Sequence, residues 1–160
     1  KGKNWGVLDK VYDAIGDGTV VMGGIPYPLN LDALRQHSIA NTTIFKCFSR
    51  SYVNRNFVFI FPVGSVSLHH SRESLEYNVQ TKNYIAKAIE SLERDVKVEI
   101  QKELDKLNNS NDFFTKLQTI RQHNTVDSLC HDSVFNFTSK DGKTVNVVVS
   151  PQGEVTPEGD

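Results

Sequence analysis

Cysteine is scarce in this sequence, and its scarcity excludes the simplest metal and disulfide frameworks. The chain of 160 residues has two cysteines, Cys47 and Cys130, which stand far apart and form no CxxC pair. A zinc site is therefore not expected, because such sites bring their ligands in closely spaced pairs. A single disulfide stays open from the sequence, but we expect two reduced, buried thiols.

The sequence also lacks an excess of either charge and any long apolar run. Lys and Arg number 18 against 19 for Asp and Glu, which gives a formal net charge of −1. A chain with a net charge this close to zero has no overall electrostatic attraction to the phosphate backbone of nucleic acid. No apolar run approaches the roughly 20 residues that cross a bilayer, and no signal-peptide pattern opens the chain. We therefore expect neither direct nucleic-acid binding nor a transmembrane segment.

What is present is the composition of a folded domain. Hydrophobic residues make up 38% of the chain and charged residues 23%, as in an ordinary globular protein with a core. The chain opens on Lys1-Gly2-Lys3-Asn4 without a methionine, and we interpret it as a piece of a larger protein. We expect one domain over residues 1–150 and a mobile tail over residues 151–160.

The first part of the chain is predicted to form short elements separated by glycine and proline. In order, we expect a short helix over Trp5–Ile15, a strand over Thr19–Met22 ended by Gly23-Gly24, an extended Ile25–Pro28, a short helix within Leu29–Ile39, a strand over Thr43–Phe48, a turn at Asn54–Asn56 and a strand over Phe57–Phe61. The last strand is continuously apolar, so we expect both of its faces to be covered.

One long amphipathic helix dominates the second part. The spacing of apolar residues predicts it from near Ser74 to about Leu107, with charged residues on the opposite, solvated face. Asp112 can cap a shorter helix, and alternating strands around Asp141-Gly142 predict a hairpin near the C-terminus. The predicted fold class is α+β, with a mixed sheet packed on one long helix, plus a C-terminal helix and hairpin.

The junction between the last apolar strand and the long helix is the most informative stretch. Pro62 ends the strand, Gly64 allows a sharp bend, and Ser71 or Ser74 can then cap the helix. Arg72 in the first helical turn would oppose the helix dipole, which suggests that its guanidinium serves another purpose.

A phosphate is the ligand that such an arginine would suit. The guanidinium is a planar fork of donors, and the first turn of a helix adds free backbone N–H groups. The alternative is an ordinary surface arginine whose charge pairs with Glu73 or Glu76.

The motif Ser71-Arg72-Glu73-x-Leu75, between an apolar strand and a long helix, resembles the middle domain of the ninety-kilodalton heat-shock chaperones. A closer resemblance is to the rIIA-like rapid-lysis proteins of bacteriophages, which belong to the GHKL ATPase superfamily. Further matching segments follow in the same order across most of residues 20–140: Gly23-Gly24-Ile-x-Tyr27-Pro28, Phe61-Pro62-x-Gly64-Ser65, Thr81 at the helix opening and, more weakly, Ser133-Val134, Thr138 and Lys140.

The resemblance implies a transducer domain with the βαβ layout usual in that superfamily. Arg72 would reach the γ-phosphate of ATP bound in a separate N-terminal domain, and Ser71 and Glu73 would fix its position. ATP and Mg²⁺ would be bound mainly by that domain, and hydrolysis would be coupled to a conformational change. By itself the present chain would hydrolyse nothing.

The sequence also differs from the chaperone motif at one position near Arg72. Glu76 stands where the chaperones carry a glutamine four residues after the arginine, and a carboxylate there would repel the anion. Gln80-Thr81-Lys82 resembles the Gln-Thr-Lys loop of gyrase-type transducers, whose lysine binds the γ-phosphate, so Gln80 and Lys82 are further candidates. The implied partners are the N-terminal ATPase domain, a second copy and a second phage protein. The implied setting is the cytoplasm of an infected bacterium, with association at the membrane for the full-length protein.

Two other functions stay open. The chain could be a non-catalytic interaction module that uses its sheet or its long helix. It could also be a small metal-dependent nuclease built on His69, His70 and Glu73, although adjacent loop histidines usually point apart. A Cys–His nucleophile within His123, Asp127, Cys130 and His131 is disfavoured, because neighbours along an extended chain do not easily face each other.

Overall fold

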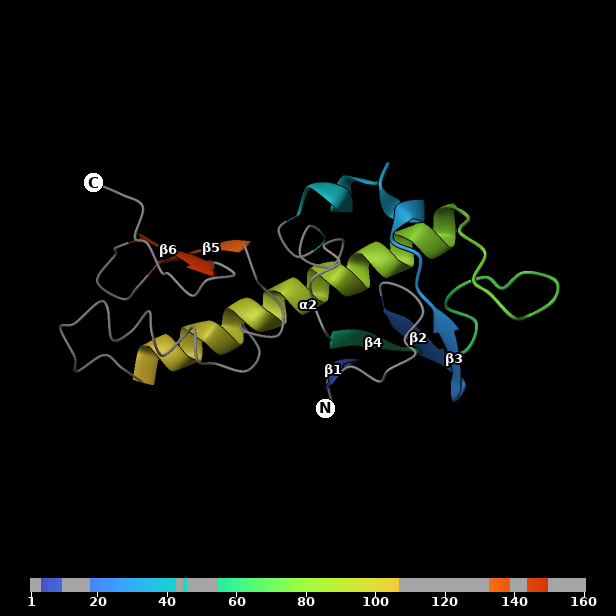
Figure 1. Ribbon diagram of the computed structural model, residues 1–160, viewed down its shortest axis with the longest axis horizontal. Coiled ribbons are helices and arrows are strands. Elements are labelled where there is room, and N and C mark those ends of the chain that lie inside the picture. Colours follow the sequence, from blue (N-terminus) through green and yellow to red (C-terminus); the bar gives the residue numbers. More distant parts are fainter. Residues whose placement is uncertain are drawn as a thin grey trace. The chain divides into compact units, whose positions relative to one another are not determined.

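The computed structural model describes residues 4–9, 18–42, 45, 55–106, 133–138 and 144–149. The chain falls into two compact units, Lys1–Leu92 and Glu93–Asp160. The first unit contains a four-stranded mixed sheet, and one long helix begins in it (Figure 1). The α+β class predicted from the sequence is confirmed at this level, whereas the βαβ transducer layout and the single domain over residues 1–150 stay predictions.

The sheet has the strand order β1-β4-β2-β3. Its strands are β1 (Trp5–Asp9), β2 (Thr19–Met22), β3 (Ile25–Pro28) and β4 (Arg55–Phe61). The central pair β2 and β4 is parallel, and the two outer pairs are antiparallel. The central strands therefore require a crossover connection between them, and β3 and β1 form the edges.

The hairpin of β2 and β3 confirms the strand predicted at Thr19–Met22 and its end at Gly23-Gly24. The two glycines have φ angles of 61° and 82°. A two-residue loop with positive φ at both positions matches the twist of the strands it joins, and glycine adopts it without steric cost. Pro26 and Pro28 lie in the edge strand β3, where a missing N–H is tolerated.

The predicted helix at Trp5–Ile15 is wrong over its described residues. Trp5–Asp9 is the strand β1, which pairs antiparallel with β4 so that Trp5 lies opposite Phe59. Pairing with an apolar central strand satisfies the backbone of this segment more fully than a short isolated helix would.

Strand β4 is confirmed as a strand but is longer and less enclosed than predicted. It begins at Arg55, so the turn predicted at Asn54–Asn56 is wrong for Arg55 and Asn56. Phe57, Phe59 and Phe61 are buried on one face, whereas Ile60 on the other face is 54% exposed. The prediction that both faces are covered is therefore wrong at Ile60, whereas Val58, which points to the same face, is half-buried.

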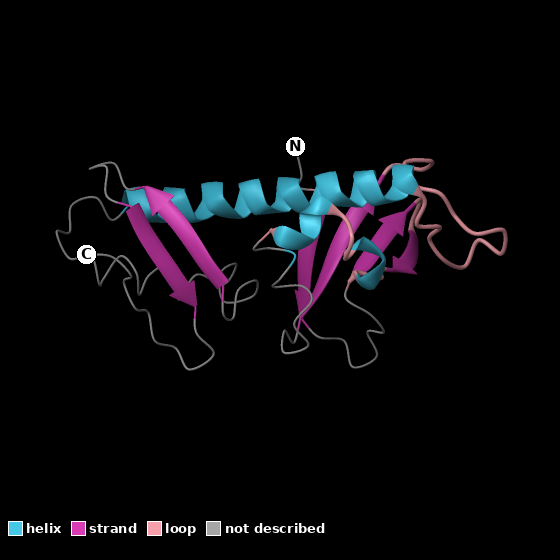
Figure 2. Ribbon diagram, turned by 90° about the horizontal axis from the view of Figure 1, so that it is seen from above, coloured by secondary structure: helices cyan, strands magenta, loops and turns pink. Residues whose placement is uncertain are grey.

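Helix α2 (Val79–Lys106) is the predicted long helix, but its start lies beyond Ser74. In the first unit its initial turns lie along the sheet (Figure 2), where the Tyr84 ring meets the Phe61 ring edge-on at a centroid distance of 4.9 Å. The predicted amphipathic pattern is confirmed, since Ile85, Ala86, Ile89, Leu92 and Val96 are buried while Lys87, Glu90, Arg94, Lys97 and Lys102 are exposed.

Two short 3-10 helices replace the single helix predicted within Leu29–Ile39. They are η1 (Asp32–Leu34) and η2 (Ser38–Asn41), and each buries one apolar side chain. The strand predicted over Thr43–Phe48 has one described residue, Phe45, which is buried and has helical rather than extended backbone. The other residues of that stretch lie outside the described ones.

The second unit contains the predicted C-terminal hairpin. Strands β5 (Ser133–Thr138) and β6 (Thr144–Val149) pair antiparallel. The turn at Asp141-Gly142, the shorter helix after Asp112 and the tail from residue 151 lie outside the described residues. Within the described ranges, no helix is long and apolar enough to cross a membrane.

Candidate functional site: the Arg72 hairpin

The chain leaves β4 through a tight turn at its C-terminal end. The Ser65 N–H donates to the Pro62 carbonyl at 3.2 Å, and the Ser65 hydroxyl donates to the same oxygen at 2.7 Å. Gly64 has a φ of 82°, which an L side chain rarely adopts. Val66, 5% exposed, then anchors the outgoing chain in the core. The predicted bend at Pro62 and Gly64 is confirmed.

Residues 67–76 fold back on themselves and are called here the Arg72 hairpin (the green loop beside the start of α2 in Figure 1). Leu68 and Leu75 form an antiparallel bridge, and the His69 N–H donates to the Ser74 carbonyl at 3.1 Å. The turn closes where the Arg72 N–H donates to the His69 carbonyl at 2.8 Å. Leu75, 2% exposed, ties the returning arm to the core.

The predicted helix caps at Ser71 and Ser74 are wrong. Helix α2 begins at Val79, and its cap is Asn78, whose Oδ1 accepts the Thr81 N–H at 2.9 Å. The residues predicted to form the first turn fold as a hairpin instead, because an extended arm carries Leu75 into the core. Arg72 and Glu73 therefore lie before the helix and not in its first turn.

Arg72 is exposed and has an unusual backbone. Its φ of 58° makes it the one residue other than glycine with positive φ among the described residues. This left-handed conformation costs an L residue roughly 1–2 kcal/mol. Within the described part of the chain, no hydrogen bond or ion pair engages its guanidinium. The alternative, in which the charge of Arg72 pairs with Glu73 or Glu76, is not observed among the described residues.

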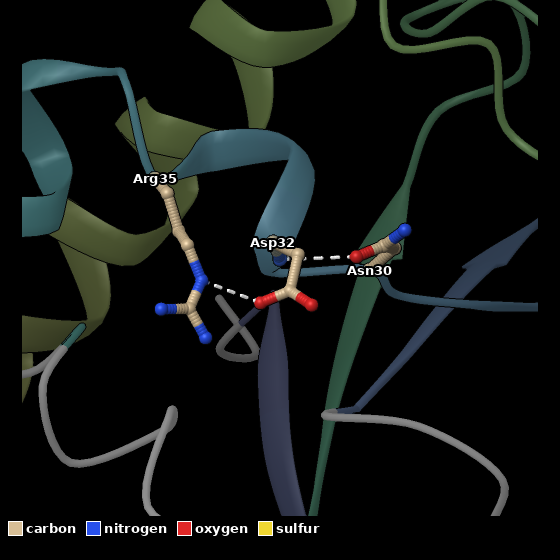
Figure 3. Close-up of polar contacts among 3 residues, drawn as sticks. All are labelled: Asn30, Asp32 and Arg35. Atoms are coloured by element: carbon tan, nitrogen blue, oxygen red, sulfur yellow. Dashed lines mark hydrogen bonds and ion pairs between the residues drawn. The ribbon is translucent and has the colours of Figure 1, made fainter.

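Arg35 shows what a locally paired arginine looks like in the same unit. Its Nε lies 2.6 Å from Asp32 Oδ1, and the Asp32 N–H donates to Asn30 Oδ1 at 3.0 Å (Figure 3). Both side chains of the ion pair are about 70% exposed, so the pair adds little stability. It nonetheless occupies the guanidinium, whereas the Arg72 guanidinium has its donors available.

The remaining predicted residues fall into two groups. Ser71 and Glu73 flank Arg72 at the exposed tip, and the Ser71 hydroxyl accepts the Glu73 N–H at 3.5 Å, the long limit for such a bond. Gln80 and Lys82 lie in the first turn of α2, Gln80 exposed and Lys82 half-buried. Across the described residues, no hydrogen bond joins either of these side chains to Arg72.

The hairpin is tied to α2 by a cluster of hydrogen bonds at its base. The Ser67 N–H donates to Thr81 Oγ1 at 2.9 Å, and Asn78 Nδ2 donates to Ser67 Oγ at 2.8 Å. The Glu76 N–H donates to the Ser67 carbonyl at 2.9 Å. The sequence interpretation missed this cluster; the available signal was Asn78 directly before Val79, since asparagine is a capping residue by type.

The nuclease alternative places its metal ligands on the Arg72 hairpin. His69 and His70 are both exposed, and no group of three His, Cys, Asp or Glu side chains among the described residues could hold a metal ion. The second histidine-containing candidate, at His123, Asp127, Cys130 and His131, lies outside the described residues, as does Cys47.

Comparison of the chain with protein-family models, with curated proteins and with solved structures finds no match. The resemblance to rIIA-like and chaperone transducer domains therefore depends on the motifs in the sequence.

Proposed function

We propose that this chain is the transducer domain of an rIIA-like GHKL ATPase from a bacteriophage, and that Arg72 contacts the γ-phosphate of ATP held in a neighbouring domain. The supporting observation is the placement of Arg72: an exposed, unpaired guanidinium at the tip of a hairpin with both arms anchored in the core. A cation held out in this way can meet an anion that another domain carries.

Arg72 acts by electrostatic stabilisation. Negative charge shifts between the phosphate oxygens as the γ-phosphoryl group is transferred, and a guanidinium placed there stabilises the transition state more than the bound substrate. Arginines in this role raise turnover by about 10³–10⁵-fold. ATP, Mg²⁺ and the carboxylate that orients the attacking water belong to the neighbouring domain.

Transmission of the signal is assigned to the sheet and α2, in the βαβ layout of transducer domains. The Arg72 hairpin stands in the chain between the turn that follows β4 and the cap of α2 at Asn78, so docking of Arg72 acts on the ends of both elements. Lys82, in the first turn of α2, is the second candidate for a phosphate contact.

The test is ATP turnover by the full-length protein carrying Arg72→Ala. We expect kcat to fall by about 10²-fold or more with nucleotide affinity little changed, because the lost contact forms chiefly in the transition state. Arg72→Lys restores only part of the rate, since an ammonium cannot form the bidentate contact. Arg94→Ala, which removes an exposed arginine from α2, is the matched control. Wild-type turnover in Arg72→Ala would contradict the proposal.

A non-catalytic interaction module is the second candidate, and exposed apolar side chains favour it. Ile25, Ile60 and Val63 are 55%, 54% and 79% exposed. Ile60 lies on the open face of the sheet, where an apolar side chain can contact a partner protein, whereas the strand register places Ile25 on the opposite face. If the chain is such an interaction module, Arg72→Ala leaves partner binding by the full-length protein intact, whereas Ile60→Asp abolishes it.

A further inference from the structure

Thr81 differs from the other polar residues of the described part of the chain, because it alone among them is fully buried, with 0% of its surface exposed. Its hydroxyl oxygen accepts the Ser67 N–H at 2.9 Å, across 14 residues of chain. A buried N–H or hydroxyl without a partner is costly, so this bond strongly favours one position of Ser67 relative to the helix.

Ser67 is held from two further sides. Asn78 Nδ2 donates to its hydroxyl at 2.8 Å, and the Glu76 N–H donates to its carbonyl at 2.9 Å. Asn78 also caps α2 through its Oδ1, so one side chain fixes both the helix start and the hairpin base. Every polar group of Ser67 is therefore engaged, and Ser67 precedes the Leu68–Leu75 bridge that forms the arms of the hairpin.

We propose that Thr81 is a positioning residue for the Arg72 site, whose hydroxyl holds the hairpin base on the first turn of α2 and so fixes where the Arg72 guanidinium stands. This inference rests on the proposed function of Arg72. Thr81 touches no nucleotide and acts through Ser67. A displacement of about 1 Å at a reacting group can lower a rate by about 10²-fold, so a loosened hairpin base is sufficient to uncouple Arg72.

The test compares Thr81→Val with Thr81→Ser in the full-length protein. Valine keeps the branched shape but has no acceptor for the Ser67 N–H, whereas serine keeps the hydroxyl. We expect Thr81→Val to lower kcat by about 10²-fold with nucleotide affinity unchanged, and Thr81→Ser to retain most of the wild-type rate. Limited trypsin digestion supplies a readout of hairpin position, since Thr81→Val should speed cleavage after Arg72 selectively and leave cleavage elsewhere unchanged.

Asn78→Ser keeps the test informative if Thr81→Val folds poorly. Serine can still cap α2, but it has no amide to donate to Ser67 Oγ, so we expect faster cleavage after Arg72 with the helix intact.

Uniformly faster cleavage at all sites would indicate a merely structural role and overturn the inference. Normal turnover in Thr81→Val together with lost turnover in Arg72→Ala would overturn it while leaving the proposed function standing. Normal turnover in Arg72→Ala itself would overturn the proposed function.

Discussion

The backbone at residue 72 suits glycine better than arginine. With a φ of 58°, Arg72 has the left-handed conformation in which the Cβ of an L residue lies too close to the following carbonyl. Residues kept in such a conformation are frequent at functional sites, where the strain is tolerated for the sake of the side chain. Arg72 is exposed, and no ion pair or hydrogen bond within the described residues engages its guanidinium, so a use for its charge would account for arginine at this position.

Replacing Arg72 by glycine should therefore separate stability from activity. We expect Arg72→Gly to raise the free energy of unfolding by up to about 1 kcal/mol, measured by urea denaturation, while ATP turnover is lost. The gain is below the full steric cost because glycine also increases the entropy of the unfolded chain.

Arg72→Ala is the matched comparison, because alanine has a Cβ and bears the same backbone strain. Its stability should stay near that of the wild-type chain. A lower stability in Arg72→Gly than in Arg72→Ala would mean that the arginine conformation carries no strain.

At the scale of elements, β4 shows how the sheet is covered. Its phenylalanines alternate with Val58 and Ile60, and the phenylalanine face is buried while Ile60 is 54% exposed. An apolar run alone cannot tell a strand covered on two faces from one covered on a single face. The spacing of its aromatic residues was the available signal, since Phe57, Phe59 and Phe61 recur at the period of one strand face.

Two substitutions test this one-sided arrangement. Phe59→Ala removes a side chain that is 1% exposed and should lower the free energy of unfolding by about 3–5 kcal/mol. Ile60→Thr keeps a β-branched residue on the open face and should change it by no more than about 0.5 kcal/mol. Both values come from denaturant unfolding of the same chain. Equal losses in the two variants would mean that both faces of β4 are enclosed.

The start of α2 illustrates a limit of local patterns. The apolar spacing that predicts the helix body is confirmed, because burial of one helix face sets that spacing. The start was predicted too early, since Ser71 and Ser74 are good capping residues by type. Only the tertiary contact of Leu75, which draws the preceding arm into the core, decides between these serines and Asn78.

For the whole molecule, composition and periodicity were enough to predict a folded α+β chain with one long helix and a C-terminal hairpin. Composition and periodicity could not predict strand β1, because its partner β4 lies some fifty residues away in the chain. The candidate site could be predicted only in part. Arg72 was identified by its motif, whereas the Ser67, Asn78 and Thr81 cluster that supports it arises from contacts between segments.

The most direct measurement is chemical modification of Arg72 in the full-length protein by an arginine-selective dicarbonyl reagent, followed by mass spectrometry. Magnesium with a non-hydrolysable ATP analogue should protect Arg72 from the reagent, and magnesium with ADP should not, because only the former carries a γ-phosphate. Arg94 serves as the internal reference and should react equally in both. Equal modification of Arg72 with the two nucleotides would contradict the account.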